Sequence, residues 1–341
     1  MNIALVGEAW GEQEERQRTP FVGPAGWHLT QMLNEAGIHR ADCYLTNVFN
    51  LRPKPTNDIE NLCGPERRGG FSPLRSIGPN KYVREEFFPE VIRLHRELAN
   101  LSPNIAVLLG NTACWAMLGT TNISKIRGVP CYSTVLPKLK CLPTYHPAVI
   151  LPGRSYELRP IIVADLIKAK RESAFPEVRR PERTIYIEPT LEEMEWYRHE
   201  FLDNARKISF DIETHGQQIT CIGFAPDSMS GLVVPFFDGR SATGSYWPTA
   251  HDEERAWDYV RDVLNSDQPK VAQNGLYDIN FLWRSYGITV KNYEDDTMLL
   301  HHALQPESEK GLGFLGSIYT NEASWKMMRT RTKDIAVKKD K

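Results

Sequence analysis

The sequence predicts an α/β protein of two domains, a three-layer αβα domain with a mainly parallel sheet followed by a domain with a mixed sheet. Two observations support this class. Short apolar segments alternate with amphipathic ones in the first half, as parallel strands covered on both faces do. A charged, proline-bounded segment at 175–183 then interrupts the pattern. We therefore expect domains at 1–174 and 184–341, joined by a linker at 175–183.

The elements of the first half follow from local sequence signals. Residues 2–7 form a short apolar run that ends in glycine, and residues 105–110 repeat that pattern. Residues 85–100 carry apolar side chains at helical spacing. The expected strands are 2–7, 43–48, 105–110 and 135–142, and the expected helices are 26–36, 85–100, 111–118 and 160–173.

The second half begins again with strands. Antiparallel strands followed by strand–helix units are typical of a mixed sheet. The expected strands are 184–187, 208–212, 219–225, 231–235 and 270–273, and the expected helices are 190–204, 251–265 and 277–286.

Composition narrows the class of protein. Of 341 residues, 41% are hydrophobic and 25% are charged, as in ordinary globular domains. No apolar run approaches the roughly 20 residues that span a bilayer. The early carboxylate Glu8 and the missing basic lead-in predict no signal peptide. We expect a soluble protein of a bacterial or phage-infected host cytoplasm, with no membrane partner.

Charge is distributed unevenly along the chain. Residues 1–180 carry 23 Lys and Arg against 17 Asp and Glu, although the whole chain has a net charge of −2. A basic first half suits a polyanion and an acidic second half suits metal ions, but an ordinary solvated surface explains the same counts equally well.

Three polar segments of the first half follow expected strands. They are Gly7–Gly11 with its continuation to Gly26, Thr46-Asn47, and Pro143–Ala148. Strand ends of an open α/β sheet are where such folds bind ligands. Together the segments supply a carboxylate, an aromatic ring, an amide and an imidazole, which suit recognition of a flat heterocycle and departure of an anionic base.

These segments resemble those of the uracil-DNA glycosylase superfamily, in the branch that often carries an iron–sulfur cluster. The matching motifs are Gly7-Glu8, Pro20-Phe21-Val22-Gly23, Thr46-Asn47 and His146-Pro147-Ala148. The resemblance implies that Phe21 stacks on a flipped uracil and Asn47 binds its edge. It further implies that His146 stabilises the departing uracil anion.

The resemblance also suggests where water and DNA meet the pocket. Glu8 would lie near the attacking water, and Ala9 follows it in the substrate-binding segment, where other branches place a carboxylate. Ile150 or Leu151 would enter the gap left in the base stack. The expected partner is DNA, either single-stranded or containing uracil.

Some positions depart from the pattern of that branch. No C-x-x-C pair precedes the first strand, Asn50 replaces a usual cluster cysteine and Cys63 stands alone. We therefore predict no iron–sulfur cluster. Trp10 replaces a usual proline, so an alternative is a DNA-binding, uracil-sensing module without catalysis.

The basic side chains of segment 50–82 either track phosphates or form an ordinary charged loop; they are Arg52, Arg67, Arg68, Arg75, Lys81 and Arg84.

In the second half, Asp211 and Glu213 stand two residues apart on an expected strand and so project from one face. Asp278 opens a helix after a later strand. Clustered carboxylates favour Mg²⁺ or Mn²⁺. Asp296 is expected to support structure rather than bind metal.

The order D-x-E followed by N-x-x-Y-D resembles the 3′–5′ proofreading exonuclease domain of family A DNA polymerases, an RNase H-like fold. The resemblance implies that Asp211, Glu213 and Asp278 hold two metal ions. No Tyr-x-x-x-Asp or His-x-x-x-x-Asp spacing follows Asp278. We therefore expect a domain incomplete at its C-terminus and an impaired exonuclease. The two halves together resemble the N-terminal part of a phage-type DNA polymerase, which implies a polymerase domain or subunit as a further partner.

Overall fold

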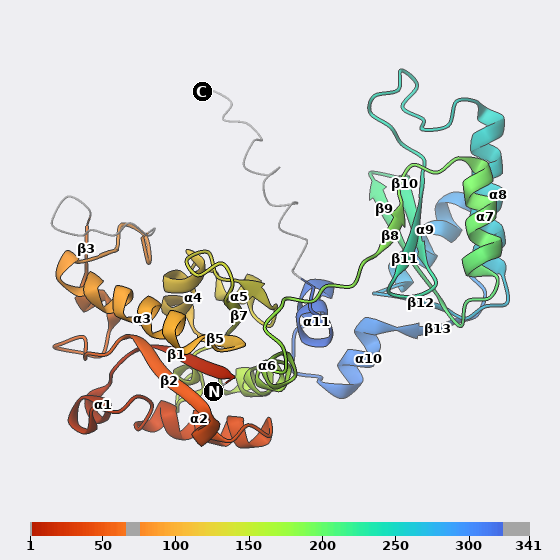
Figure 1. Cartoon of the computed structure of the whole chain (residues 1–341). Helices are drawn as coiled ribbons and strands as arrows, with labels where there is room; N and C mark the ends of the chain where they lie inside the picture. Colours follow the sequence, from red (N-terminus) through yellow and green to blue (C-terminus); the bar gives the residue numbers. More distant parts are fainter. Residues whose placement is uncertain (1, 66–75, 323–341) are drawn as a thin grey trace. The chain divides into compact units, whose positions relative to one another are not determined.

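The computed structural model describes residues 2–65 and 76–322. They divide into two compact units, the first comprising Met1–Arg179 together with the residues from Gly313 on, and the second Arg180–Leu312. Figure 1 labels the helices and strands. In this part of the chain, every helix is too short or too polar to span a lipid bilayer.

The first unit contains a five-stranded sheet in the order β2-β1-β5-β7-β6. Strand β1 (Ile3–Ala9) runs parallel to β2 (Cys43–Phe49) and to β5 (Ile105–Leu109), and β5 runs parallel to β7 (Lys140–Thr144). Only the short edge strand β6 (Cys131–Tyr132) is antiparallel among these described strands. The predicted, mainly parallel sheet is confirmed.

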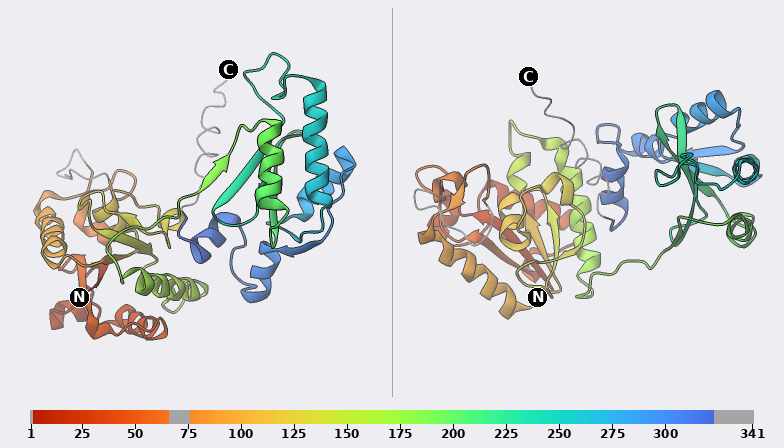
Figure 2. Two further views of the ribbon diagram at one scale, coloured as in Figure 1. Left: turned by 45° about the vertical axis from the view of Figure 1, so that its right-hand side comes forward. Right: turned by 90° about the horizontal axis from the view of Figure 1, so that it is seen from above.

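Helices cover both faces of this sheet (Figure 2). Alternate side chains of a strand point to opposite faces, and Leu5 of β1 packs with α2 (Pro24–Glu35) and α6 (Arg159–Glu172). Val6 instead packs with α3 (Phe88–Leu101) and α4 (Asn111–Leu118). The three-layer αβα arrangement is therefore confirmed. The remaining short elements of this unit are α1 (Glu12–Gln17), η1 (Arg40–Asp42), η2 (Ile59–Leu62), β3 (Cys63–Gly64), β4 (Tyr82–Val83), η4 (Glu85–Phe87), α5 (Ile123–Ile126), η5 (Pro147–Ile150) and η6 (Tyr156–Leu158).

The strand expected at 135–142 is shifted toward the C-terminus. The hydroxyl of Ser133 accepts hydrogen bonds from the backbone N–H groups of Val135 (3.2 Å) and Leu136 (3.1 Å). These bonds turn the chain, so β7 begins only at Lys140. A polar serine can replace strand pairing in this way because its side chain competes for backbone donors.

The segment 50–82 contains basic side chains that pair with carboxylates of the same unit. Lys81 pairs with Glu60, and Arg84, two residues past the segment, lies 3.3 Å from Glu86. Arg67, Arg68 and Arg75 of the expected phosphate-tracking loop lie outside the described residues.

Helix α11 (Leu312–Tyr319) packs on the first unit, although it follows the second along the chain. The buried ammonium of Lys168 on α6 donates to the carbonyl oxygens of Gly128 (2.6 Å), Ser317 (2.7 Å) and Thr320 (2.6 Å). The guanidinium of Arg127, in a buried ion pair with Asp165, donates to the Ser317 hydroxyl at 2.8 Å. The expected second domain, 184–341, included α11, whereas the structure gives it buried partners in the first unit.

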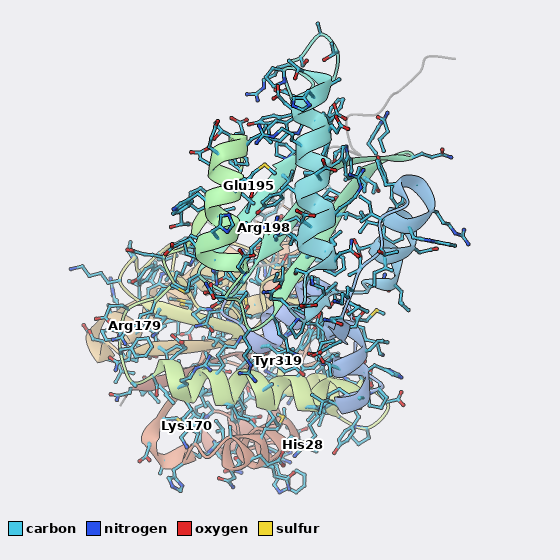
Figure 3. All side chains as sticks on the ribbon, turned by 90° about the vertical axis from the view of Figure 1, so that its right-hand side faces the viewer. His28, Lys170, Arg179, Glu195, Arg198 and Tyr319 are labelled. Atoms are coloured by element: carbon cyan, nitrogen blue, oxygen red, sulfur yellow. The ribbon has the colours of Figure 1, made fainter. Side chains whose placement is uncertain are left out.

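The second unit has a mixed, six-stranded sheet in the order β13-β12-β9-β10-β11-β8, as predicted. Figure 3 shows its helices α7 and α8 side by side, with Arg198 at their seam; the Arg198 guanidinium donates to Asp262 of α8 at 2.9 Å. The elements are β8 (Thr184–Tyr186), α7 (Leu191–Tyr197) continued by η7 (Arg198–Leu202), β9 (Ile208–His215), β10 (Gln218–Ala225), β11 (Ser230–Pro235), α8 (Ala250–Asn265), β12 (Lys270–Ala272), α9 (Leu276–Tyr286), β13 (Tyr293–Asp296) and α10 (Thr297–Leu304).

Candidate functional site

A cavity of about 360 Å³ lies in the first unit where β1, β2 and β7 end. It collects side chains from all three polar segments of the sequence. The expected site residues on its wall are Glu8, Ala9, Phe21, Asn47, His146 and Leu151. A volume of this order is typical of pockets for small ligands.

Gly7 lies next to two of these residues, Asn47 and Phe21. A Cβ atom added to Gly7 would lie 2.3 Å from Oδ1 of Asn47 and 2.4 Å from Cζ of Phe21. The registered pair Gly7–Asn47 of β1 and β2 brings the amide to this point. The absence of a side chain at Gly7 therefore allows the Asn47 amide and the Phe21 ring to converge.

Phe21 is held by its backbone as well as by packing. Its φ of 55° is left-handed, a conformation that a bulky residue adopts only when its surroundings enforce it. The Arg40 guanidinium donates to the carbonyl oxygens of Pro20 (3.2 Å) and Phe21 (3.0 Å). The Phe21 ring then faces the His146 ring, with centroids 6.3 Å apart and an interplanar angle of 29°.

His146 is held in one tautomer by the turn that follows it. Its Nδ1 accepts a hydrogen bond from the backbone N–H of Ala148 at 3.1 Å, so the proton of the neutral ring resides on Nε2. Burial, helped by the charge of Arg154, lowers the pKa of His146 to about 4. The imidazole is therefore a neutral donor at neutral pH.

Glu8 lies at the end of β1 and is half-buried. The hydroxyl of Thr112, in the first turn of α4, donates a hydrogen bond to its carboxylate. Burial raises the pKa of Glu8 above its ordinary value, although the Thr112 bond opposes that rise. This carboxyl is thus poised to hold or accept a proton within the cavity.

Glu14 is a cavity residue that the sequence analysis missed. Its carboxylate accepts backbone N–H bonds from Gly11 (3.1 Å), Val22 (3.0 Å) and Gly23 (2.7 Å). It thereby ties the two glycine-bounded segments together. The available signal was its spacing, because a Glu three residues after Gly11 sits where a capping-box carboxylate is found.

The structure separates the two neighbouring residues expected to enter the base stack. Leu151 lines the cavity, whereas Ile150 is only 2% exposed and packs in the core. The 3₁₀ helix η5 turns adjacent side chains in different directions, so Ile150 is corrected to a core residue. Trp10 also lines the cavity, which stays open beside the indole.

In the second unit, the alternation of β9 is as predicted. Ile208, Phe210 and Ile212 are buried, whereas Asp211 and Glu213 are exposed. Asp278 of α9 is 4% exposed and accepts the backbone N–H of Ile212 at 3.1 Å. The peptide between the two β9 carboxylates therefore contacts the third carboxylate directly.

Electrostatics at Asp278 reflect that position. Burial raises the pKa of Asp278 to about 6, and the negative charge of Asp211 adds to the rise. Asp296 instead accepts from the N–H groups of Asn274 (3.0 Å) and Gly275 (2.9 Å). It also caps α10 (Thr297–Leu304), and these hydrogen bonds support the local structure.

The carboxylates of Asp211, Glu213 and Asp278 are the candidate metal ligands of the second unit. Three carboxylates suit a hard divalent cation in type, and Asp211 and Glu213 share one face of β9. In the described ranges, however, no group of three or more His, Cys, Asp or Glu side chains gathers closely enough to hold a metal ion. The donor chemistry fits Mg²⁺ or Mn²⁺, while a closed site is not formed by these residues as they stand.

Comparison with known proteins also divides the chain into two regions, although the match to the second region extends beyond Leu312 and so includes α11. Residues 1–166 match the family model of the uracil DNA glycosylase superfamily, and residues 186–337 match that of a 3′–5′ exonuclease. A type-4 uracil-DNA glycosylase of Thermotoga maritima is 34% identical over 174 residues, covering 49% of this chain and 76% of that protein. One from Archaeoglobus fulgidus is 33% identical over 156 residues, covering 44% and 66%. The solved EXO domain of Aedes aegypti Nibbler is 14% identical with a TM-score of 0.34, covering 48% of this chain and 81% of that chain.

Proposed function

Because this chain belongs to the uracil-DNA glycosylase superfamily and carries a 3′–5′ exonuclease domain, we propose that its first unit excises uracil from DNA. The reaction is hydrolysis of the N-glycosidic bond of a uracil extruded from the base stack. One observation carries this proposal: Glu8, Phe21, Asn47 and His146 line a single cavity. Extrusion costs a few kcal/mol and is cheapest from single strands.

Binding of the base relies on Phe21 and Asn47. The Phe21 ring offers a flat apolar face to the pyrimidine. The Asn47 amide both donates and accepts, so it pairs with the O4 and N3–H of uracil. The rigid placement of both side chains around Gly7 favours one orientation of the base.

Departure of the base relies on His146 and Glu8. The Nε2–H of the neutral His146 ring donates to the uracil oxygen on which negative charge develops. The Glu8 carboxylate, when ionised, orients a water and accepts its proton as the water attacks the sugar carbon. The reaction needs no metal ion at these residues.

The proposal is tested with a single-stranded oligonucleotide containing one uracil, incubated with EDTA and then treated with alkali. We expect strand scission at the uracil, reduced at least 100-fold by Asn47→Ala or His146→Ala, in line with the loss of an oriented donor. The exposed residues His39 and Asn100 provide the matched controls His39→Ala and Asn100→Ala. Undiminished scission in both site variants would contradict the assignment.

The alternative is a uracil-sensing module that binds DNA without catalysis. The presence of Trp10 on the cavity wall favours this alternative, because a bulky indole restricts the space for sugar and water. Tight binding of the uracil oligonucleotide with no abasic product would support the sensor over the enzyme, and abasic product that appears in Trp10→Pro would show that the indole blocks catalysis.

For the second unit we propose metal-dependent trimming of DNA 3′ ends, impaired in this chain. Asp211, Glu213 and Asp278 would have to draw closer together to hold Mg²⁺ or Mn²⁺, which would then activate a water and stabilise the leaving 3′ oxygen. The missing Tyr-x-x-x-Asp or His-x-x-x-x-Asp spacing removes the fourth carboxylate, so turnover is expected to be slow.

The test of the second unit is degradation of a 3′-labelled single strand with Mg²⁺ or Mn²⁺. Efficient degradation that Asp211→Ala abolishes, and that the surface variant Asp258→Ala leaves intact, would overturn the proposed impairment.

We further propose that both units serve a phage-type DNA polymerase, present as another domain or subunit, in a bacterial or infected-host cytoplasm. Two DNA-directed units in one chain support this arrangement.

A further inference from the structure

We propose that Arg93 of α3 is a positioning residue that sets the orientation of the Asn47 amide and hence the preference of the cavity for uracil. The inference deepens the proposed function and rests on it. Arg93 does not line the cavity itself. It acts from the outer side of β2, through the backbone that carries Asn47.

The contacts of Arg93 concentrate on the end of β2. One guanidinium nitrogen, Nη2, donates to the carbonyl oxygens of Asn47 at 2.8 Å and Val48 at 3.2 Å. The other, Nη1, donates to the Thr46 hydroxyl at 3.3 Å. Three consecutive residues of the strand are thus bound by one planar, multidentate group.

Two glutamates of the same helix fix the guanidinium. Arg93 Nε lies 2.9 Å from Glu90, and Nη1 lies 2.7 Å from Glu97. Both glutamates also bind the strand or its continuation, since Glu97 accepts from the Thr46 hydroxyl at 3.0 Å and Glu90 accepts from the Asn50 N–H at 2.9 Å. This Arg93 network therefore fastens α3 to the strand on both sides of Asn47.

Strand β2 needs such fastening because it lies at the edge of the five-stranded sheet, where β1 is its neighbour. The outward backbone groups of an edge strand have no further strand to bind. The registered pairing with β1 runs through Gly7–Asn47 to Ala9–Phe49, and Arg93 adds bonds to the Asn47 and Val48 carbonyl oxygens along the same stretch.

A small movement of this backbone would change what the amide reads. Oδ1 of Asn47 and the Phe21 ring crowd the same point above Gly7. Uracil offers an acceptor at O4 and a donor at N3, and cytosine offers the reverse. Hydrogen bonds weaken steeply outside about 2.7–3.2 Å, so an amide that shifts or rotates loses discrimination between the two bases before it loses general contact.

The experiment compares full-length Arg93→Met, Arg93→Lys and Arg96→Met, the last an exposed arginine of the same helix. Kinetics of uracil release from a single-stranded oligonucleotide are measured with equilibrium binding of uracil- and cytosine-containing oligonucleotides, and thermal melting reports folding. We expect Arg93→Met to lower kcat/KM and the uracil-to-cytosine affinity ratio each about tenfold. Arg93→Lys should recover part of the ratio, and Arg96→Met should match the wild type.

The outcomes separate this inference from the proposed function. An unchanged affinity ratio in Arg93→Met overturns the inference, even if melting temperature or overall activity falls, because a purely structural role would weaken both bases alike. A wild-type chain that makes no abasic product overturns the proposed catalysis. In that case the affinity ratio of the same variants still decides whether Arg93 positions the reading amide.

Discussion

The backbone N–H of Ala148 donates to Nδ1 of His146, two residues before it in the chain. The turn into η5 thus selects the imidazole tautomer before any substrate arrives. Burial then keeps the ring neutral by lowering its pKa to about 4. A neutral donor gains strength as negative charge develops on a leaving base, and it avoids the cost of burying a cation.

This pKa predicts a pH dependence of stability. The unfolded chain binds a proton at His146 near pH 6.5, whereas the folded chain resists it until about pH 4. The free energy of unfolding should therefore fall as the pH drops through this window, by up to ~3 kcal/mol from this group. Urea unfolding between pH 7 and 4 should show that the free energy of unfolding falls less in His146→Gln than in the wild type or in His39→Gln. Parallel curves would contradict the prediction.

Gly7→Ala should disable the cavity while sparing the fold. The new methyl would displace the ends of the Asn47 and Phe21 side chains, which can move, at a stability cost of roughly 1–3 kcal/mol. We expect at least a 100-fold loss of uracil release, because two binding groups are moved together. Gly311→Ala, whose methyl meets open space, is the matched control. Full activity in Gly7→Ala would show that uracil release does not require the Asn47 amide and the Phe21 ring to converge beside Gly7.

Leu151 and Ile150 should behave differently when changed. Leu151→Ala removes a cavity-wall side chain, so we expect activity on double-stranded uracil DNA to fall about tenfold more than activity on single strands, where no stack needs filling. Ile150→Val should cost roughly 0.5–1.5 kcal/mol of stability, as core truncations do, and should leave the strand ratio unchanged. The ratio of the two rates, measured for both variants, checks the assignment. If the ratio of the double-strand rate to the single-strand rate changed in Ile150→Val and not in Leu151→Ala, the roles assigned to these two residues would be reversed.

Lys168→Met should loosen α11 from the first unit. Three carbonyl oxygens lose their buried donor, and unsatisfied buried groups cost ~1–3 kcal/mol each. We expect a drop of at least ~2 kcal/mol in unfolding free energy and faster amide exchange across 313–322. Lys170→Met, an exposed position of the same helix (Figure 3), serves as control. Equal stability of the two variants would exclude Lys168 as the anchor.

Much of this architecture was predictable from the sequence because local periodicity carries it. The alternation of β9 predicted that Asp211 and Glu213 share a face, and their exposure beside buried Phe210 confirms it. The ends of β1, β2 and β7 predicted where Glu8, Asn47 and His146 would meet, since parallel strands end at one edge.

Other features depend on contacts that local sequence does not encode. The binding of three backbone N–H groups by Glu14 joins segments eight and nine residues away, and its helix is short and polar. The hydrogen bond from Arg93 to the carbonyl oxygen of Asn47 joins residues 46 positions apart. The turn at Ser133 delays β7 through one side-chain hydroxyl, which periodicity cannot register.

The return of α11 has a consequence for biosynthesis. The chain leaves the first unit at Arg179 and rejoins it at Gly313. Ribosomes deliver a chain from its N-terminus, and domains begin to fold as they emerge. The first unit therefore waits, with the Ser317 and Thr320 partners of Lys168 missing, until the whole second unit has been translated. The unit that starts to fold first is the last to be finished.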